Sequence, residues 1–254
     1  MEIKEFKKLK GNVYELKFKS GEDVKLYDDV ILKYNLLVNK SFNDKLYEEI
    51  IKYNKSLDAY YLSLKYLNSK LRCEKEIIDY LKKKDFSVDI IDKTIERLNK
   101  FNYLNRDLYI KSYISDKYNF TSNGPVKIKR ELINLGFNEE EIDKYLDLDF
   151  DDKIKKIIDK KVKSNKKYNE YSLKINISNY LINLGYKKEM FNEYLNDVKI
   201  DNCLIIKKDI DKLKNKYQKK YSGKDLYYFI RNKLYQKGYR EEEIGDVLNE
   251  NILW

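Results

Sequence analysis

The sequence predicts a mainly α-helical protein in which four tandem three-helix repeats follow a small N-terminal domain with antiparallel β-strands. One proline and eight glycines among 254 residues leave few helix breakers. Apolar residues recur at helical spacing from residue 28 onward. In residues 1–27, by contrast, apolar and polar residues alternate one by one, as in a β-strand. A similarity at intervals of about fifty residues divides the helical part into copies. Because such repeats stack on their neighbours, we expect an elongated, curved array.

The N-terminal domain is expected to span residues 1–55 and to begin with three strands. Apolar and polar residues alternate in Val13–Phe18 and Val24–Tyr27, and the segment 20–23 between them, Ser-Gly-Glu-Asp, is typical of a hairpin turn. Ile3–Leu9 can pair with the first of these strands. A small sheet of this kind needs helices to cover one of its faces.

Two helical segments are expected to supply that cover. The first lies around Val30 to Leu37. The second begins after Asn43, a plausible N-terminal cap, and continues through Leu46, Ile50 and Ile51.

The repeat is defined by an aromatic residue at Phe86, Phe137, Tyr186 and Tyr239, with separations of 51, 49 and 53 residues. The positions nine and five before the aromatic residue, and five and nine after it, are apolar in every copy. These are Ile77, Leu81, Ile91 and Ile95; Ile128, Leu132, Ile142 and Leu146; Ile177, Leu181, Phe191 and Leu195; and Ile230, Leu234, Ile244 and Leu248. Each pair predicts the buried stripe of one helix.

The residue before each aromatic position is expected to form the turn between these two helices. It is glycine in three copies and Asp85 in the first, as a left-handed C-terminal cap requires. Ser87 and Asn138 can then cap the following helices, and Glu141 lies three residues beyond Asn138. Pro125 suits the first turn of a helix.

Each copy has room for one further helix ahead of this pair. Its apolar residues are Tyr60, Leu64, Leu67 and Leu71; Ile110, Tyr113 and Ile114; Ile154, Ile157, Ile158 and Val162; and Ile206, Ile210, Leu213 and Tyr217. The predicted repeats are residues 56–103, 104–149, 150–200 and 201–254.

Positive charge is concentrated in the first helices of copies three and four. The chain has 53 Lys and Arg against 43 Asp and Glu, a net charge of +10. Residues 153–174 hold nine lysines against two acids, and residues 207–224 hold eight lysines against two acids. The rest of the chain is therefore slightly acidic. This asymmetry favours an electrostatic surface for an anionic partner, either nucleic acid or an acidic protein face.

The lysines that we predict to bind DNA or a partner are spaced three or four residues apart, away from the apolar stripes. They are Lys153, Lys156, Lys160, Lys163 and Lys167 in copy three, and Lys208, Lys212, Lys216 and Lys219 in copy four. The alternative is a solvated helix face in a lysine-rich protein. The two corresponding helices in copies one and two carry little net charge, which favours the functional interpretation.

Several classes of enzyme are excluded or disfavoured. The absence of histidine excludes Ser-His-Asp, Cys-His and His-metal sites. Cys73 and Cys203 form no Cys-x-x-Cys pair, and no phosphate-binding glycine motif occurs. The acidic runs 139–141 and 147–152 are better explained as a helix start and a linker. We therefore expect no cofactor, no metal and no catalysis.

The sequence pattern predicts neither a signal peptide nor a membrane-spanning segment. The first seven residues lack an apolar core, and the apolar runs, such as Cys203–Ile206, are short. We expect a cytoplasmic protein, most simply a monomer.

Residues 58–148 resemble the RecX family of RecA regulators. The matching stretches are Tyr66–Glu76, Leu98–Asn105, Gly124–Leu132 and Leu135–Phe137, in that order. The resemblance implies a non-enzymatic regulator that binds the RecA–DNA filament and restrains its ATPase and strand exchange, and so acts on DNA repair, recombination and the SOS response. It implies RecA as the partner, with DNA contacted weakly or through the filament.

Two other functions stay open at this point. One is a stand-alone DNA- or RNA-binding repeat protein whose affinity is mostly electrostatic. The other, an enzyme, would need a metal held by carboxylates, and no acidic residues at helical spacing support it.

Overall fold

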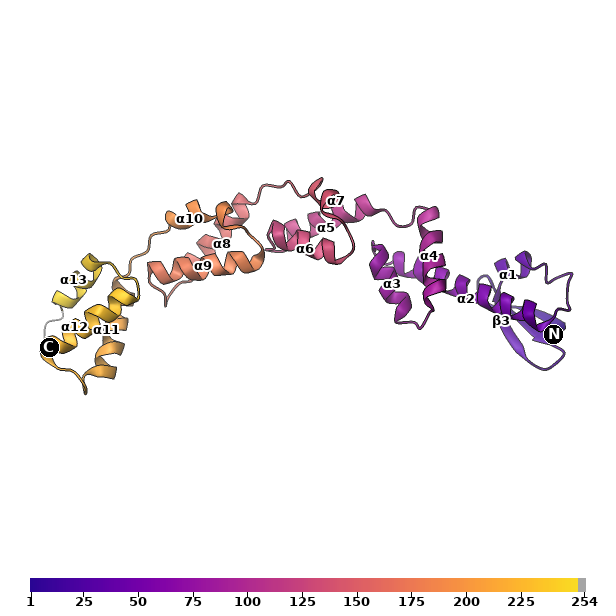
Figure 1. The fold of residues 1–254 in the computed structure, drawn as a ribbon, viewed down its shortest axis with the longest axis horizontal. Coiled ribbons are helices and arrows are strands. Elements are labelled where there is room, and N and C mark those ends of the chain that lie inside the picture. Colours follow the sequence, from indigo (N-terminus) through magenta and orange to yellow (C-terminus); the bar gives the residue numbers. More distant parts are fainter. Residues whose placement is uncertain (251–254) are drawn as a thin grey trace. The chain divides into compact units, whose positions relative to one another are not determined.

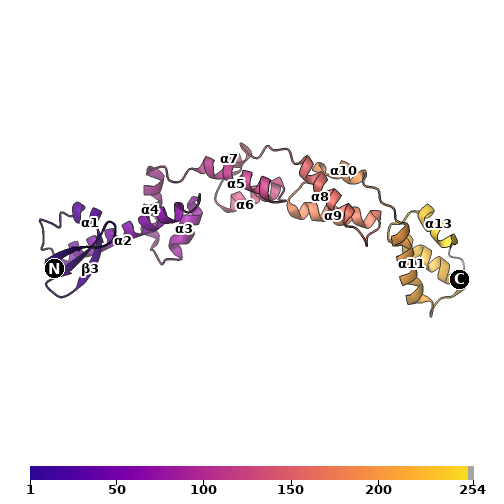
Figure 2. The same cartoon turned by 180° about the vertical axis from the view of Figure 1, so that it is seen from behind.

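The computed structural model describes residues 1–250, with side chains as far as residue 248. The described chain is mostly helical, with strands only near its N-terminus (Figures 1 and 2). It divides into two compact units, Met1–Lys111 and a second unit that begins at Ser112.

The N-terminal strands form one antiparallel sheet in the order β1-β2-β3. Their bounds are β1 (Ile3–Lys8), β2 (Val13–Phe18) and β3 (Asp23–Tyr27), so the predicted three-stranded sheet is confirmed. Leu16 of β2 pairs with Phe6 on one side and with Val24 on the other. Gly21, in the predicted hairpin turn, has a φ of +90°, a conformation that favours glycine.

Two helices cover this sheet, α1 (Asp28–Lys33) and α2 (Asp44–Leu67). The shared core consists of Ile3, Leu16, Phe18, Leu26, Val30, Ile31, Leu36, Ile50 and Leu57. The predicted cap of α2 is confirmed, because the Asn43 side chain accepts a hydrogen bond from Leu46 N–H at 2.8 Å. Helix α1 is shorter than expected, since Asn35 adopts a φ of +51° and breaks the helical path before Leu37.

Helix α2 belongs both to the N-terminal domain and to the first repeat. It runs for 24 residues without a break, through the position between residues 55 and 56 where the sequence suggests a boundary. Leu57 packs in the core of the sheet, whereas Ala59 and Tyr60 pack in the core of copy one. The two domains are therefore not separated by a break in α2. They differ only in the core that the buried residues of α2 join.

The remaining elements form the three-helix repeats. Copy one is completed by α3 (Glu74–Lys82) and α4 (Val88–Lys100); copy two contains α5 (Arg106–Phe120), α6 (Pro125–Asn134) and α7 (Glu139–Asp143). Copy three contains α8 (Asp151–Lys163), α9 (Glu170–Leu184), the 3₁₀ turn η1 (Lys188–Met190) and α10 (Asn192–Asn196). Copy four contains α11 (Cys203–Tyr217), α12 (Gly223–Gln236) and α13 (Glu241–Glu250).

The predicted apolar columns form the cores of these copies. Fifteen of the sixteen residues are buried, and the exception is Leu146, which is half-buried. Helix α7 ends at Asp143, three residues before Leu146. Tyr145 N–H bonds back to the Ile142 carbonyl, so a tight turn replaces the last turn of the expected helix.

The turns within the copies are left-handed as predicted, with φ of +60° at Asp85, +91° at Gly136, +89° at Gly185 and +85° at Gly238. Asn138 and Glu141 form the expected reciprocal cap, with distances of 2.8 and 2.9 Å. Ser87 lies at the cap position of α4, but its side chain makes no capping hydrogen bond.

Candidate functional site

The exposed lysines of α8 and α11 form the candidate site. Ile154 and Ile158 bury one side of α8, and Ile206 and Ile210 bury the same side of α11. The opposite side of α8 exposes Lys156, Lys160 and Lys163, and that of α11 exposes Lys208, Lys212 and Lys216. We call these two sets the basic faces. Their exposure agrees with the spacing in the sequence, since residues three or four apart share a helix face.

Two predicted lysines continue the basic faces beyond the ends of the helices. Lys167 lies after the end of α8, and Lys219 after the end of α11, and both are exposed. The Lys167 amine lies 5.4 Å from the centre of the Tyr168 ring, so it is also close to a partly exposed aromatic side chain.

Lys153 is not part of the exposed face, and this expectation was wrong. Its amine donates hydrogen bonds to the main-chain carbonyls of Tyr118 and, at 2.9 Å, Thr121. Burial lowers the pKa of the Lys153 amine. The two acceptors precede it by 35 and 32 residues, so helical spacing could not indicate this contact. Lys153 fixes α8 to the end of α5.

The basic faces are not neutralised by nearby acids. Within residues 1–248, no ion pair joins an acid to Lys156, Lys160, Lys163, Lys167, Lys208, Lys212, Lys216 or Lys219. Asp209 of α11 contacts Lys237 at 3.0 Å and accepts a hydrogen bond from the Tyr239 hydroxyl at 3.0 Å. The lysine charges are therefore available to an anionic partner.

Sequence reasoning missed two other lysines of α8. The Lys155 amine lies 4.8 Å from the centre of the Tyr194 ring, and the Lys161 amine lies 3.9 Å from that of Tyr180. Tyr194 also donates to Asp151 at 2.7 Å, and this carboxylate raises the pKa of the Tyr194 hydroxyl to about 12. Their spacing places both lysines off the basic face, since Lys161 follows the buried Ile154 by seven residues and shares its side of α8. Spacing could not indicate their ring partners, which come from other helices.

A contact between copies two and three, the 2/3 joint, positions α8. Gly124 N–H donates to the Leu184 carbonyl at 2.7 Å, and Val126 N–H donates to the Gly185 carbonyl at 3.1 Å. Beside them, the Phe150 ring packs edge-on against the rings of Tyr118 and Tyr186. The acceptors of the Lys153 amine belong to the same joint. Main-chain groups therefore supply most of its polar contacts.

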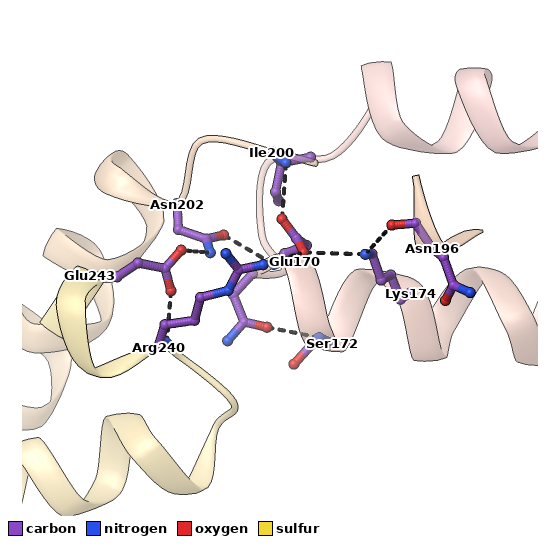
Figure 3. A network of polar contacts seen from close by, with 9 residues as sticks. Glu170, Ser172, Lys174, Asn196, Ile200, Asn202, Arg240 and Glu243 are labelled. Carbon is purple, nitrogen blue, oxygen red and sulfur yellow. Dashed lines mark hydrogen bonds and ion pairs between the residues drawn. The ribbon is translucent and has the colours of Figure 1, made fainter. Parts of the chain in front are cut away.

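A polar network between copies three and four, the 3/4 joint, positions α11. Asn202, the residue before α11, is buried; it accepts from Glu170 N–H at 3.0 Å and donates to Glu243 at 2.7 Å (Figure 3). One carboxylate oxygen of Glu170 lies 3.2 Å from both Arg240 and Lys174. The start of α11 is thus fixed by a main-chain group of α9 and a side chain of α13.

The exposed amines of α8 and α11, with tyrosines near some of them, are suited to binding an anionic partner. In the part of the chain that the structure describes, no group of three or more Cys, Asp or Glu side chains is placed to hold a metal ion. None of the described helices is both long and apolar enough to cross a membrane.

Comparison with known proteins identifies the family. A family model described as "RecX, first three-helix domain" matches residues 59–98, which include the C-terminal part of α2, α3 and most of α4. The "Regulatory protein RecX" of Streptococcus agalactiae is 29% identical, over 96% of this chain and 97% of the relative. That of Finegoldia magna is 33% identical, over 64% of this chain and 77% of the relative. The chain belongs to the RecX family.

The RecX fold also extends over most of the chain. A solved structure titled "Crystal structure of regulatory protein RecX" covers 78% of this chain and 99% of its own, with a TM-score of 0.66 and 19% identity. The family resemblance expected from residues 58–148 is therefore confirmed. RecX proteins are named for regulation and not for a catalysed reaction.

Proposed function

We propose that this protein regulates the RecA recombinase by binding the RecA–DNA filament and restraining its ATPase and strand exchange. Membership of the RecX family supports the partner. The observation in the structure that carries the proposal is the pair of exposed, unpaired basic faces on equivalent helices of copies three and four. The activity is expected in the cytoplasm, where the filament forms.

The protein acts by occupying a surface of the filament, and no covalent chemistry is involved. Lys156, Lys160 and Lys163 attract a polyanion and hold it, because each amine near a DNA phosphate releases counterions. The equivalent face of α11 provides a second anchor. A regulator that lies on the filament blocks the movements that ATP hydrolysis and strand exchange require.

The decisive experiment measures DNA-dependent ATP hydrolysis by the cognate recombinase while the protein is titrated from substoichiometric to equimolar amounts. We expect inhibition well below one regulator per recombinase protomer. No inhibition at equimolar protein would contradict the proposal.

A charge-reversal variant tests the basic face itself. K156E/K160E/K163E should bind the filament more weakly than the wild type, by a factor that grows as the salt concentration falls. K82E/K83E/K84E is the matched control, because it changes the net charge equally at exposed lysines of copy one. Equal losses in both variants would show that only net charge matters.

A stand-alone nucleic-acid-binding protein is the second candidate, and the exposed lysines without ion-pair partners on α8 and α11 favour it. It would bind bare single-stranded DNA tightly, with a steep salt dependence, whether or not recombinase is present. Tight binding to bare DNA together with no effect on the ATPase would replace the first proposal by this one.

A further inference from the structure

The middle helices of copies two, three and four expose an apolar pair that their cores do not use. The pair occupies the positions eleven and four residues before the turn aromatic, so its members lie seven residues apart. The pairs are Val126 and Ile133 in α6, Ile175 and Ile182 in α9, and Tyr228 and Tyr235 in α12. Their exposed fractions are 43 and 40%, 45 and 40%, and 55 and 65%. We call these six side chains the outer stripe.

The outer stripe lies on the side of each helix that faces away from the core. In α9 the buried residues are Leu173, Ile177 and Leu181. At 100° per residue, Ile175 and Ile182 lie roughly opposite the centre of this buried stripe. A spacing of seven residues is about two helical turns, so both members of a pair point to the same side, roughly 10 Å apart along the helix.

Copy one lacks the outer stripe. The same two positions of α3 hold Lys75 and Lys82, and both are exposed. Single exposed apolar residues are ordinary on protein surfaces. The recurrence of a pair at the same two positions in three copies is different, because neither folding nor solubility requires it. A surface that is repeated in this way is suited to a partner that presents the same feature several times.

Exposed basic residues lie beside two of the three pairs of the outer stripe. Arg130 lies beside the α6 pair and Lys224 beside the α12 pair, and both are exposed. Within residues 1–248, neither is joined to an acid by an ion pair.

Most acidic side chains of the same helices form ion pairs with residues outside the outer stripe. Glu131 of α6 pairs with Lys117 at 2.9 Å, and Glu170 of α9 with Arg240 at 3.2 Å. Asp225 of α12 is exposed beside Lys224 and reduces the positive charge at that pair. At copy two, the partner that complements Arg130 has an apolar centre with a carboxylate at its border.

At copy two, the outer stripe borders a groove. Val126 lines it together with Leu146 and Met190, and its volume is about 540 Å³. Its charged lining residues are Lys129, Lys187, Asp143 and Asp147. Lys129 is already bound to Glu139 and Asp143, at 2.7 and 2.9 Å. The groove has room for an apolar side chain of a partner.

We propose that the outer stripe is a docking surface for a protein that repeats the same apolar patch along an assembly, with a carboxylate placed to meet Arg130 at copy two. Identifying that assembly with the protomers of the recombinase filament rests on the function proposed above. The basic faces belong to the first helices and the outer stripe to the middle helices, so anion binding and protein docking use different helices. Apolar side chains gain little against a phosphate backbone, whereas they dominate the centres of protein interfaces.

The test uses the full-length double variant I175S/I182S, with K75S/K82S as its matched control at the equivalent positions of copy one. Both pairs are exposed, and circular dichroism with thermal unfolding checks that the variants fold. Binding is measured to preformed recombinase–DNA filaments and to bare single-stranded DNA, and self-association by sedimentation.

We expect I175S/I182S to bind the filament about tenfold more weakly than the wild type, because two aliphatic side chains no longer lose water at the interface. Binding to bare DNA and the sedimentation coefficient should not change, and the control should behave as the wild type. Y228S/Y235S should repeat the loss in copy four.

Four results would overturn the proposal. If the stripe variants bind filaments as tightly as the wild type while K156E/K160E/K163E binds weakly, the outer stripe has no docking role and the proposed function stands. An equal loss of binding to bare DNA would make the outer stripe a nucleic-acid surface. A wild type that dimerises, with monomeric stripe variants, would assign the stripe to a second copy. Failure of the wild type to bind filaments at all would instead remove the proposed function, and this docking proposal with it.

Discussion

At the 2/3 joint, main-chain groups of neighbouring copies meet directly, with Gly124 N–H 2.7 Å from the Leu184 carbonyl. At the 3/4 joint, side chains fill the equivalent place: the amide of Asn169 donates to the Lys237 carbonyl at 2.8 Å, and the Tyr171 ring packs on Gly238. In both joints the start of a middle helix meets the glycine turn of the next copy. The same two parts therefore dock through different interactions.

The apolar positions that recur in every copy therefore define its three helices, but they do not define the joint with the next copy. A main-chain contact between Gly124 and Gly185 leaves no room for a Cβ atom on either residue. A side-chain network can change rotamers and is weakened by salt. We therefore expect the 2/3 joint to be rigid and intolerant of substitution, and the 3/4 joint to be tolerant and dependent on ionic strength.

The substitution Gly185→Ala should cause the largest loss. The new Cβ would lie 2.5 Å from Lys127 N, a main-chain atom, at a residue whose φ is +89°. Steric overlap and backbone strain together should lower the free energy of unfolding by about 3 kcal/mol or more. Urea unfolding measures the change.

Gly136→Ala is the matched control for this variant. Gly136 occupies the same turn position with a φ of +91°, and its Cβ would meet no atom within 4 Å. Only the backbone penalty remains, about 1 kcal/mol. Equal losses at the two positions would show that the close approach of the main chains adds nothing.

Gly238→Ala should cost less than Gly185→Ala, about 2 kcal/mol, because the new Cβ would overlap a side-chain ring and not the main chain. The Tyr171 ring can rotate away. Adding Tyr171→Ala should therefore recover part of the loss, and a double-mutant cycle measures the coupling. An additive cycle would place the whole cost in the backbone.

Acid should weaken copy two, whose middle helix begins at the 2/3 joint. Burial alone would raise the pKa of Glu131, but hydrogen bonds from Lys117 and Tyr113, and the Lys117 charge, lower it below its usual value. A lowered pKa contributes stability above the unfolded value, which is lost as the pH falls through the folded value. Glu131→Gln should remove about 1 kcal/mol at neutral pH and flatten the acid limb of the stability profile. An unchanged acid limb would contradict this assignment.

The smallest effect is expected for the exposed ion pair of the 3/4 joint. Arg240 is mostly exposed where it contacts Glu170, so Arg240→Gln should cost about 0.2–1 kcal/mol at low salt and almost nothing in molar salt. Thermal unfolding at two salt concentrations measures it. A salt-independent loss would mean that packing, and not charge, holds this side chain.

Local pattern was sufficient for the strands, the order of the helices and most buried positions, but not for the ends of α1 and α7. Ile77, Ile128, Ile177 and Ile230 are all buried as predicted, because side chains three or four residues apart must share a helix face. The left-handed turns were also predictable, since glycine at a helix end indicates that conformation. The predicted exposure of Lys156, Lys160 and Lys163 followed from the same spacing, and their role in binding stays a prediction.

The sequence alone thus determined the repeat, its cores and the concentration of positive charge, because each depends on residues close along the chain. Only the tertiary structure decided that Lys153 turns inward, since its acceptors lie 32 and 35 residues earlier. It also decided that Gly124 meets Gly185 through the main chain while Asn169 reaches Lys237 through a side chain. Helix formation follows from spacing within one segment, whereas the contacts between copies depend on how separately folded segments approach, and spacing does not record that.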